Sequence, residues 1–208
     1  MLGSITDGSD ALNVVYKPTA GERPLHDFPI GTLTRREVAA FVVSDATGWD
    51  IVPPTVLRDG PFGEGMIQEW IEPDDDADVV AMILADDERL RPMAIFDAIV
   101  NNTDRKGGHI LALPSGAIRG VDHGVTFSTH PKLRTVLWGW RGAPLSPSEV
   151  AVLRAVRDAL DGTLGAALRE LLAVDEVEAT IARTEELLAS GAFPQPPSDW
   201  PAVPWPPY

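Results

Sequence analysis

The stretch from residue 101 to residue 124, NNTDRKGGHILALPSGAIRGVDHG, brings acidic, amide and histidine side chains together in one part of this 208-residue chain. It begins with a polar loop that directly follows an apolar segment, and this loop contains Asp104 and His109. The letters ILAL and AIRGVD, separated by PSG, predict a β-hairpin that ends at Asp122. Such a concentration of polar groups beside a core element is costly unless the groups are hydrogen-bonded or functional.

Asp104, His109 and Asp122 supply carboxylate oxygens and an imidazole nitrogen, which are ligands for divalent cations. Asp122 lies between Gly120 and Gly124, so the chain at this strand end can approach a metal ion and its phosphates closely. The alternative is a hydrogen-bonded turn in which Asp and Asn side chains cap backbone groups. The residues alone leave both interpretations open.

The sequence before this stretch predicts a small β-rich unit. Residues 10–17, DALNVVYK, have the β-branched and aromatic composition of a strand that ends at a lysine. Residues 34–48 have apolar side chains at helical spacing and end at a glycine, with Thr32 or Thr34 as the N-cap. The letters IVPPTVLRDG and GEGMIQEWIE then predict two short strands joined by a Gly-containing turn.

Lys17 and Glu37 are candidates for an ion pair between this strand and this helix. If the helix packs on the sheet, Glu37 near its start can meet the ammonium group of Lys17. A cleft lysine held by a helix glutamate can reach the phosphates of a nucleotide. A lysine at the end of an apolar strand also commonly extends its charged end to the surface.

The rest of the chain is helical in character. Residues 79–101 predict a helix, and residues 146–189 predict two or three amphipathic helices, the first with a Ser-x-x-Glu capping box. The acidic letters DDDAD at 74–78 predict a linker that is either a solvated hinge or the start of a helix, and not a metal site. The tail FPQPPSDWPAVPWPPY predicts extended chain, docked on its own domain or in a partner's groove. The overall plan is α+β and bilobal, with an N-lobe at 1–73 and a C-lobe at 74–208.

The charge composition limits the possible partners. The chain has 31 Asp and Glu against 17 Lys and Arg, a net charge of −14, which disfavours nucleic acid and charge-driven docking on anionic membranes. No apolar run reaches the roughly 18 residues of a membrane helix, no secretory signal is visible and there is no cysteine. We therefore expect a cytoplasmic protein without an integral membrane segment, which handles phosphates through local cations and metal ions.

Four motifs occur in a characteristic order: VVYKP at 14–18, GERPL at 21–25, DFPIGTL at 27–33 and KLRTVLWGWRGAPL at 132–145. Together with the central stretch, they resemble the actinobacterial phosphatidylinositol 3-/4-kinase-like proteins and, more distantly, the HipA-type kinases. The resemblance covers nearly the whole chain. It implies a kinase-like fold with a small β-rich N-lobe and a helical C-lobe that contains an embedded β-hairpin.

The resemblance also implies roles for individual residues. Lys17, paired with Glu37, corresponds to the lysine that binds ATP. Asp104, which is followed by an arginine, corresponds to the catalytic aspartate. His109 and Asp122 correspond to the residues that bind Mg²⁺ or Mn²⁺.

Gln68 and Trp70 stand where the hinge of a kinase passes the adenine of ATP. Three features depart from the resemblance. His109 replaces the Asn that is usual in phosphoinositide kinases, which favours Mn²⁺ relative to Mg²⁺. Only 16 residues precede Lys17, which leaves little room for a turn that covers the phosphates. No basic segment for an inositol phosphate is visible, so the acceptor is left open as a small molecule, a lipid or a protein.

The sequence therefore predicts a phosphotransferase that moves phosphate from ATP to a hydroxyl acceptor. The alternatives are a nucleotide-binding pseudokinase or interaction module, and nucleotidyl transfer on a kinase-like fold. A metal-dependent hydrolase that also uses His123 is a further alternative, but it leaves Lys17 and Glu37 without a role.

Overall fold

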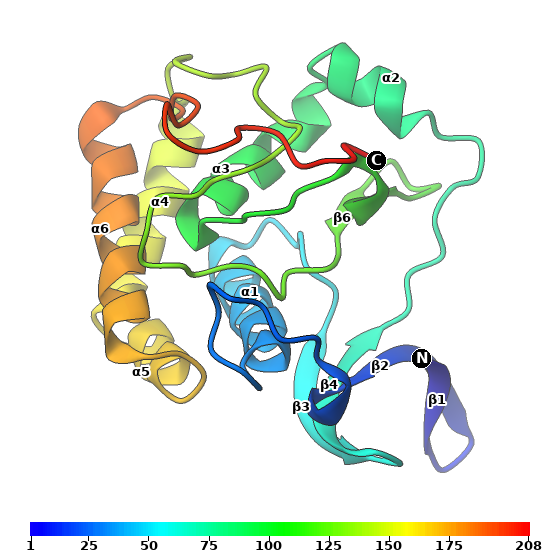
Figure 1. Ribbon diagram of the computed structural model, residues 1–208. Coiled ribbons are helices and arrows are strands. Elements are labelled where there is room, and N and C mark those ends of the chain that lie inside the picture. The colour runs from blue at the N-terminus through cyan, green and yellow to red at the C-terminus, as the bar shows by residue number, and fades with distance from the viewer.

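The computed structural model describes residues 1–208 and shows a small antiparallel sheet beside a larger helical body (Figure 1). The strand order in the sheet is β1-β2-β4-β3. The strands are β1 (Leu2–Asp7), β2 (Asp10–Pro18), β3 (Thr55–Gly60) and β4 (Gly63–Glu69). The mixed α+β architecture predicted from the sequence is confirmed.

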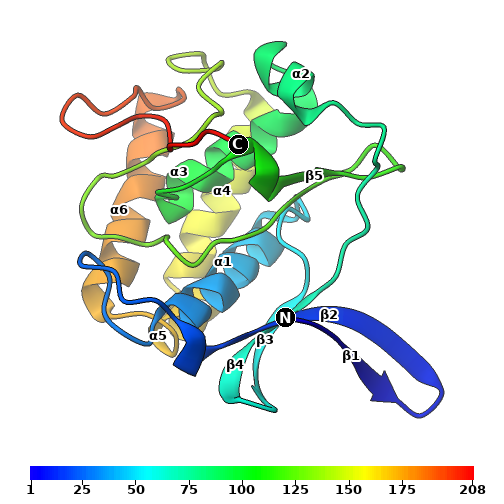
Figure 2. The same ribbon diagram turned by 45° about the vertical axis from the view of Figure 1, so that its right-hand side comes forward.

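The helical body has a two-stranded hairpin at one side, as Figure 2 shows from a second side. Its helices are α1 (Leu33–Thr47), α2 (Val79–Leu84), α3 (Arg91–Val100), α4 (Pro147–Leu160), α5 (Thr163–Arg169) and α6 (Val174–Ser190). The hairpin consists of β5 (Ile110–Ala112) and β6 (Ile118–Gly120), as the central stretch predicts. None of the helices combines the length and the apolar character that a membrane span needs.

The prediction of one continuous helix over 79–101 is wrong, because the structure has two helices there. The chain leaves α2 after Leu84 and begins α3 only at Arg91. Between them the Asp87 side chain accepts a hydrogen bond from the backbone of Arg89 and starts a short 3-10 turn. Local Asp-to-backbone bonds of this kind compete with the helical pattern, and apolar periodicity alone does not reveal them.

Strand β1 forms a hairpin with β2. The pairing runs from Leu2 and Val15 at one end to Asp7 and Asp10 at the other. Gly8 in the connecting turn has a φ of +61°, a conformation that glycine adopts without strain. This turn lies at the opposite end of β2 from Lys17, so it is not placed over the lysine.

Helix α1 belongs to the main hydrophobic core. This core contains 28 buried residues and includes Ala39 and Val43 of α1, both without exposed surface. The sheet has only a separate cluster of three buried residues around Tyr16. The main core therefore spans residues on both sides of the lobe boundary at 73 and 74, a division that stays a prediction. Because α1 is fixed in the body, a contact between α1 and β2 connects the sheet to the body.

The N-terminus of α1 is capped by a distant residue and not by its own threonines. Thr32 occupies the N-cap position but makes no side-chain cap bond. Instead, the Glu22 carboxylate accepts hydrogen bonds from the backbone N–H groups of Leu33 at 3.2 Å and Thr34 at 2.8 Å. It also accepts one from the Thr34 hydroxyl at 2.9 Å. The loop that follows Lys17 is thereby attached to the helix that carries Glu37.

We predict that Glu22→Ala lowers the free energy of unfolding by about 1 kcal/mol, the usual loss for a helix cap. Urea denaturation followed by circular dichroism measures this change. Glu178→Ala, at an exposed position of α6, is the control and should change stability by less than about 0.5 kcal/mol. Equal stability of the two variants would contradict the capping role.

Candidate active site

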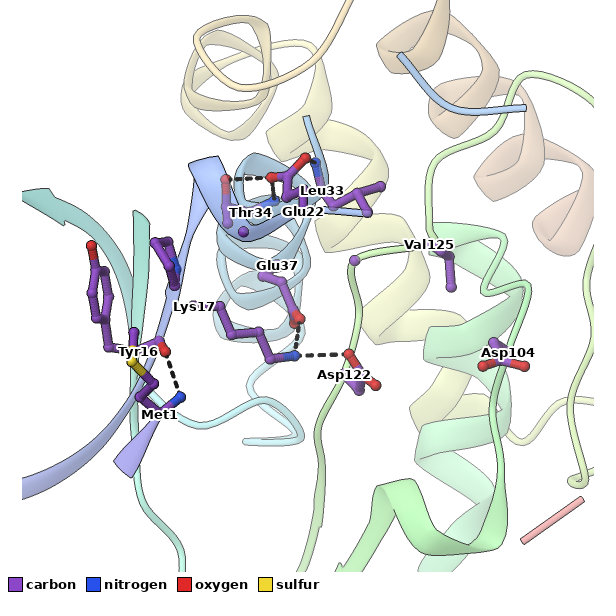
Figure 3. Close-up of a pocket in the computed structure, with 13 residues that line it drawn as sticks. Met1, Tyr16, Lys17, Glu22, Leu33, Thr34, Glu37, Asp104, Asp122 and Val125 are labelled. Carbon is purple, nitrogen blue, oxygen red and sulfur yellow. Dashed lines mark hydrogen bonds and ion pairs between the residues drawn. The ribbon is translucent and has the colours of Figure 1, made fainter. Parts of the chain in front are cut away.

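The side chain of Lys17 lies between two carboxylates (Figure 3). Its Nζ is 2.6 Å from Oε1 of Glu37 and 2.8 Å from Oδ1 of Asp122. The second oxygen of Glu37 accepts a hydrogen bond of 2.7 Å from the backbone N–H of His123. The predicted Lys17–Glu37 ion pair is confirmed, and Glu37 also holds the residue that follows Asp122.

The side chains around Lys17 carry more negative than positive charge. Burial lowers the pKa of Lys17, but the Glu37 and Asp122 carboxylates outweigh it, so the pKa lies above its ordinary value. Burial raises the pKa of Asp122, but the Lys17 ammonium outweighs it and holds this pKa below its ordinary value. Burial raises the pKa of Glu37, and Lys17 opposes the rise only in part. With both carboxylates ionised, one ammonium faces two negative groups.

His109 presents an unprotonated nitrogen to Asp122. Its Nδ1 lies 2.9 Å from the carbonyl oxygen of Asp104, which can only accept, so Nδ1 carries the proton. Burial lowers the pKa of His109, which keeps the ring neutral at pH 7. Its Nε2 then faces Oδ2 of Asp122 at 3.5 Å. Two adjacent ligands at about 2.1 Å from one ion lie about 3 Å apart, so this pair fits one divalent cation.

His109 and Asp122 alone would supply only part of a metal site. No group of three or more His, Cys, Asp and Glu side chains gathers closely enough to hold an ion alone. Mg²⁺ in phosphate-transfer sites is commonly bound by one or two protein carboxylates together with substrate phosphates. A nitrogen from His109 and an oxygen from Asp122 fit such a shared site.

Asp104 is paired with two cations. Its Oδ2 lies 3.2 Å from Nζ of Lys106, and its Oδ1 lies 3.4 Å from Nη2 of Arg134. Arg134 is itself held by a 2.7 Å hydrogen bond from Nε to the carbonyl of Thr103. The sequence motifs give no role to Lys106 or Arg134. The position of Lys106 two residues after Asp104 was a usable signal, whereas the contact of Arg134 joins segments 30 residues apart.

A fully buried arginine joins the segments that carry these residues. Arg105 pairs with Asp97 of α3 through Nε at 2.9 Å and Nη2 at 2.8 Å, and neither side chain is exposed. Its Nη1 donates to the carbonyls of His109 and Val121 at 3.2 and 3.3 Å. Its Nη2 also lies 2.6 Å from Nε2 of His123. One guanidinium thus connects α3, the polar loop and the strand that leads to Asp122.

His123 is not open to a ligand. Because a guanidinium can only donate, Nε2 of His123 accepts from Arg105 and Nδ1 carries the proton. This Nδ1 is buried without a hydrogen-bond partner. Burial and the nearby Arg105 charge hold the pKa of His123 well below its ordinary value. The ring is therefore neutral and enclosed, which argues against the hydrolase in which His123 binds a metal.

A cavity of about 380 Å³ lies beside Lys17. Its lining is Met1, Tyr16, Lys17, Pro18, Gly21, Glu22, Leu33, Thr34, Glu37, Asp104, Asp122, Gly124 and Val125. One cavity is thus lined by Lys17, Glu37, Asp104 and Asp122. His109 does not line the cavity but lies next to Asp122.

Gln68 and Trp70 do not line this cavity. Gln68 is buried and donates a 2.9 Å hydrogen bond to the hydroxyl of Thr55 on the neighbouring strand. The Trp70 indole is 41% exposed and donates to the Glu72 carboxylate at 2.9 Å. The assignment of these two residues to the adenine of ATP stays a prediction.

We predict that Asp97→Asn lowers the free energy of unfolding by about 3–5 kcal/mol, because it leaves the buried charge of Arg105 without its carboxylate. Guanidinium chloride denaturation measures the loss. Asp45→Asn, on the exposed side of α1, is the matched control and should unfold like the wild type. A similar midpoint for both variants would show that the Asp97–Arg105 pair does not hold the site together.

Comparisons with known proteins place the chain in a family. A scan against models of known protein families finds no match. Among solved structures, the Helicobacter pylori proinflammatory kinase CtkA has a similar fold, with a TM-score of 0.52 and 12% identity, covering 92% of this chain and 88% of that one. This likeness confirms the bilobal kinase-like fold. In sequence, the chain is 41% identical over 236 residues to Protein Rv2133c of Mycobacterium tuberculosis, covering 97% of this chain and 84% of the relative. The chain therefore belongs to the family of the Mycobacterium tuberculosis protein Rv2133c.

Proposed function

We propose that this chain is an ATP- and metal-dependent phosphotransferase of the phosphatidylinositol 3-/4-kinase-like type, acting on a hydroxyl acceptor. The observation that carries the proposal is the position of Lys17. Its ammonium is held by Glu37 and Asp122 in a cavity that Asp104 also lines. Catalysis of phosphoryl transfer consists mainly of positioning and charge neutralisation, and this cavity gathers the groups for both.

Lys17 is prepared to bind phosphate. Its ammonium remains charged and is aimed by Glu37, which is only 2% exposed and has no other cation beside it. When ATP binds, the contact of Lys17 with Asp122 is exchanged for the α- and β-phosphates, while the contact with Glu37 remains. Nε2 of His109 and the Asp122 carboxylate would hold Mg²⁺ or Mn²⁺. The ion, when bound, neutralises charge on the β- and γ-phosphate oxygens.

Asp104 acts on the acceptor. The acceptor hydroxyl oxygen forms a bond to the γ-phosphorus as the bond from that phosphorus to the β,γ-bridging oxygen breaks. The proton of the hydroxyl passes to the Asp104 carboxylate, and ADP leaves with the bond electrons. Lys106 and Arg134 hold Asp104 in place and put positive charge beside the transferred group, where charge stabilisation is most effective.

A nucleotide-binding pseudokinase is the second candidate, and one observation favours it. The β1–β2 turn lies at the end of β2 away from Lys17, so this turn supplies no backbone amides to the phosphates. Without these amides the chain would bind ATP but would not transfer its γ-phosphate. Nucleotidyl transfer is the third candidate and differs by moving the α-phosphate.

We predict that ATP with Mg²⁺ or Mn²⁺ raises the melting temperature, because a ligand that binds only the folded state stabilises it by about 2.7 kcal/mol at 100 times its Kd. Differential scanning fluorimetry measures the shift. Asp122→Asn should reduce it, because a charge that faces the cation is lost. Asp158→Asn, exposed on α4, should keep the full shift. No shift with either metal at millimolar ATP would refute nucleotide binding.

We predict that Asp104→Asn keeps the ATP-dependent shift in melting temperature but lowers transfer by about 10²- to 10⁴-fold, the usual contribution of a positioned base. The measurement uses γ- and α-labelled ATP with a mixture of metabolite, lipid and protein acceptors. Transfer of the γ label indicates a kinase, and transfer of the α label indicates a nucleotidyl transferase. Full γ-label transfer by Asp104→Asn would show that Asp104 is not the base.

A further inference from the structure

The last sixteen residues, 193–208, which we call the C-terminal tail, run from the end of α6 back across the body toward the hairpin (Figures 1 and 2). Near its start, the tail is paired with the chain before α4. The N–H of Phe193 donates to the carbonyl of Ala143 at 3.0 Å, and the N–H of Gly142 donates to the carbonyl of Phe193 at 3.1 Å. Its far end reaches the segment 101–109, which contains Asp104 and His109 and which we call the catalytic loop.

The middle of the tail contacts the catalytic loop through an intermediate segment. The carbonyl of Ala202 accepts hydrogen bonds from the backbone N–H of Thr135 at 3.0 Å and from the indole Nε1 of Trp138 at 2.7 Å. The segment around Thr135 is in turn hydrogen-bonded to the catalytic loop. The N–H of Arg105 donates to the carbonyl of Arg134 at 3.0 Å. The segment around Thr135 therefore lies between the tail and the catalytic loop and is hydrogen-bonded to both.

The end of the tail contacts the catalytic loop directly. The N–H of Gly107 donates to the carbonyl of Pro207 at 2.9 Å, so the loop itself does not supply this acceptor. The ring of Tyr208 lies against Gly107, because a Cβ added at Gly107 would be only 2.5 Å from Cδ2 of Tyr208. Two adjacent glycines, Gly107 and Gly108, make this part of the loop conformationally free. The tail contact restricts it from outside, in addition to the bond from the His109 N–H to the Lys106 carbonyl within the loop.

A third contact connects the tail to the loop that follows β2. Nζ of Lys132 lies 3.0 Å from Oδ2 of Asp27 and 4.9 Å from the centre of the Trp200 ring. The chain has only three lysines, Lys17, Lys106 and Lys132. Lys17 and Lys106 contact residues of the candidate site, and the backbone N–H of Lys132 donates to Oδ1 of Asn101 in the catalytic loop at 3.0 Å.

We propose that the C-terminal tail is a positioning element for the catalytic loop. It rests on the proposed function, because it assigns the tail a role in the turnover of the same site. Gly107 lies between Asp104 and His109, whose separation is already restricted by the contact of the His109 ring with the Asp104 carbonyl. The contact of Gly107 with Pro207 and Tyr208 adds a restraint on the outer side of the same loop. Lys17 and Glu37 lie on β2 and α1 and are bonded to each other, to Asp122 and to His123 and not to the tail, so tail contacts act on turnover more than on the binding of ATP.

The variants Tyr208→Ala, Gly107→Ala and the double variant test this proposal in the full chain. Each single change breaks the same contact, the first by removing the ring and the second by displacing it. Each should lower kcat by roughly 10- to 100-fold, as small misplacements of catalytic groups do, with little change in KM for ATP. The double variant should be no slower than either single variant, because contacts that act together are not additive. Trp205→Ala, which changes a tail side chain that is 88% exposed, is the matched control.

Hydrogen exchange provides a readout that does not depend on activity. The amide of Gly107 should exchange faster in Tyr208→Ala than in the wild type or in Trp205→Ala. Unchanged exchange at Gly107 in Tyr208→Ala overturns the proposal. If the wild type is active, an unchanged kcat in Tyr208→Ala overturns it as well. If the wild type transfers no phosphate, the proposed function fails, and the exchange of Gly107 still decides whether the tail holds the loop.

Discussion

The candidate site depends on one buried guanidinium, that of Arg105. It compensates the charge of Asp97 in the core and binds the chain at His109, Val121 and His123. A buried ion pair adds little net stability compared with apolar packing, but breaking one is costly because the remaining charge is left unpaired. The pair therefore acts mainly by fixing geometry. It holds the catalytic loop and the strand that leads to Asp122 at a fixed separation, and these two segments carry the proposed base and both proposed metal ligands.

Glu37 fixes the position of the sheet relative to the helical body. The helix that carries it is anchored in the main core, whereas Lys17 belongs to a sheet with a much smaller core. One carboxylate of Glu37 contacts both the Lys17 ammonium and the backbone of His123. The position of the lysine relative to Asp122 is thus set by a single side chain, that of Glu37.

Local patterns in the sequence were sufficient for the strand of Lys17, the hairpin before Asp122 and the pairing of Lys17 with Glu37. They were not sufficient where distant segments meet. The cap of α1 comes from Glu22, the second cation beside Asp104 comes from Arg134, and the partner of Gly107 comes from the tail. Gln68 faces Thr55 because of the pairing register of β3 and β4, and register decides which face of a strand each side chain occupies. These contacts depend on tertiary packing, which periodicity and motif spacing do not encode.

The most direct test of this account is a crystal structure of the chain with a non-hydrolysable ATP analogue and Mn²⁺, in which anomalous scattering locates the metal. The account predicts one Mn²⁺ bound by Nε2 of His109 and the Asp122 carboxylate, with the α- and β-phosphates beside Nζ of Lys17 and with the Lys17–Glu37 contact retained. A nucleotide bound away from Lys17, or an anomalous peak that does not involve Asp122, would contradict it.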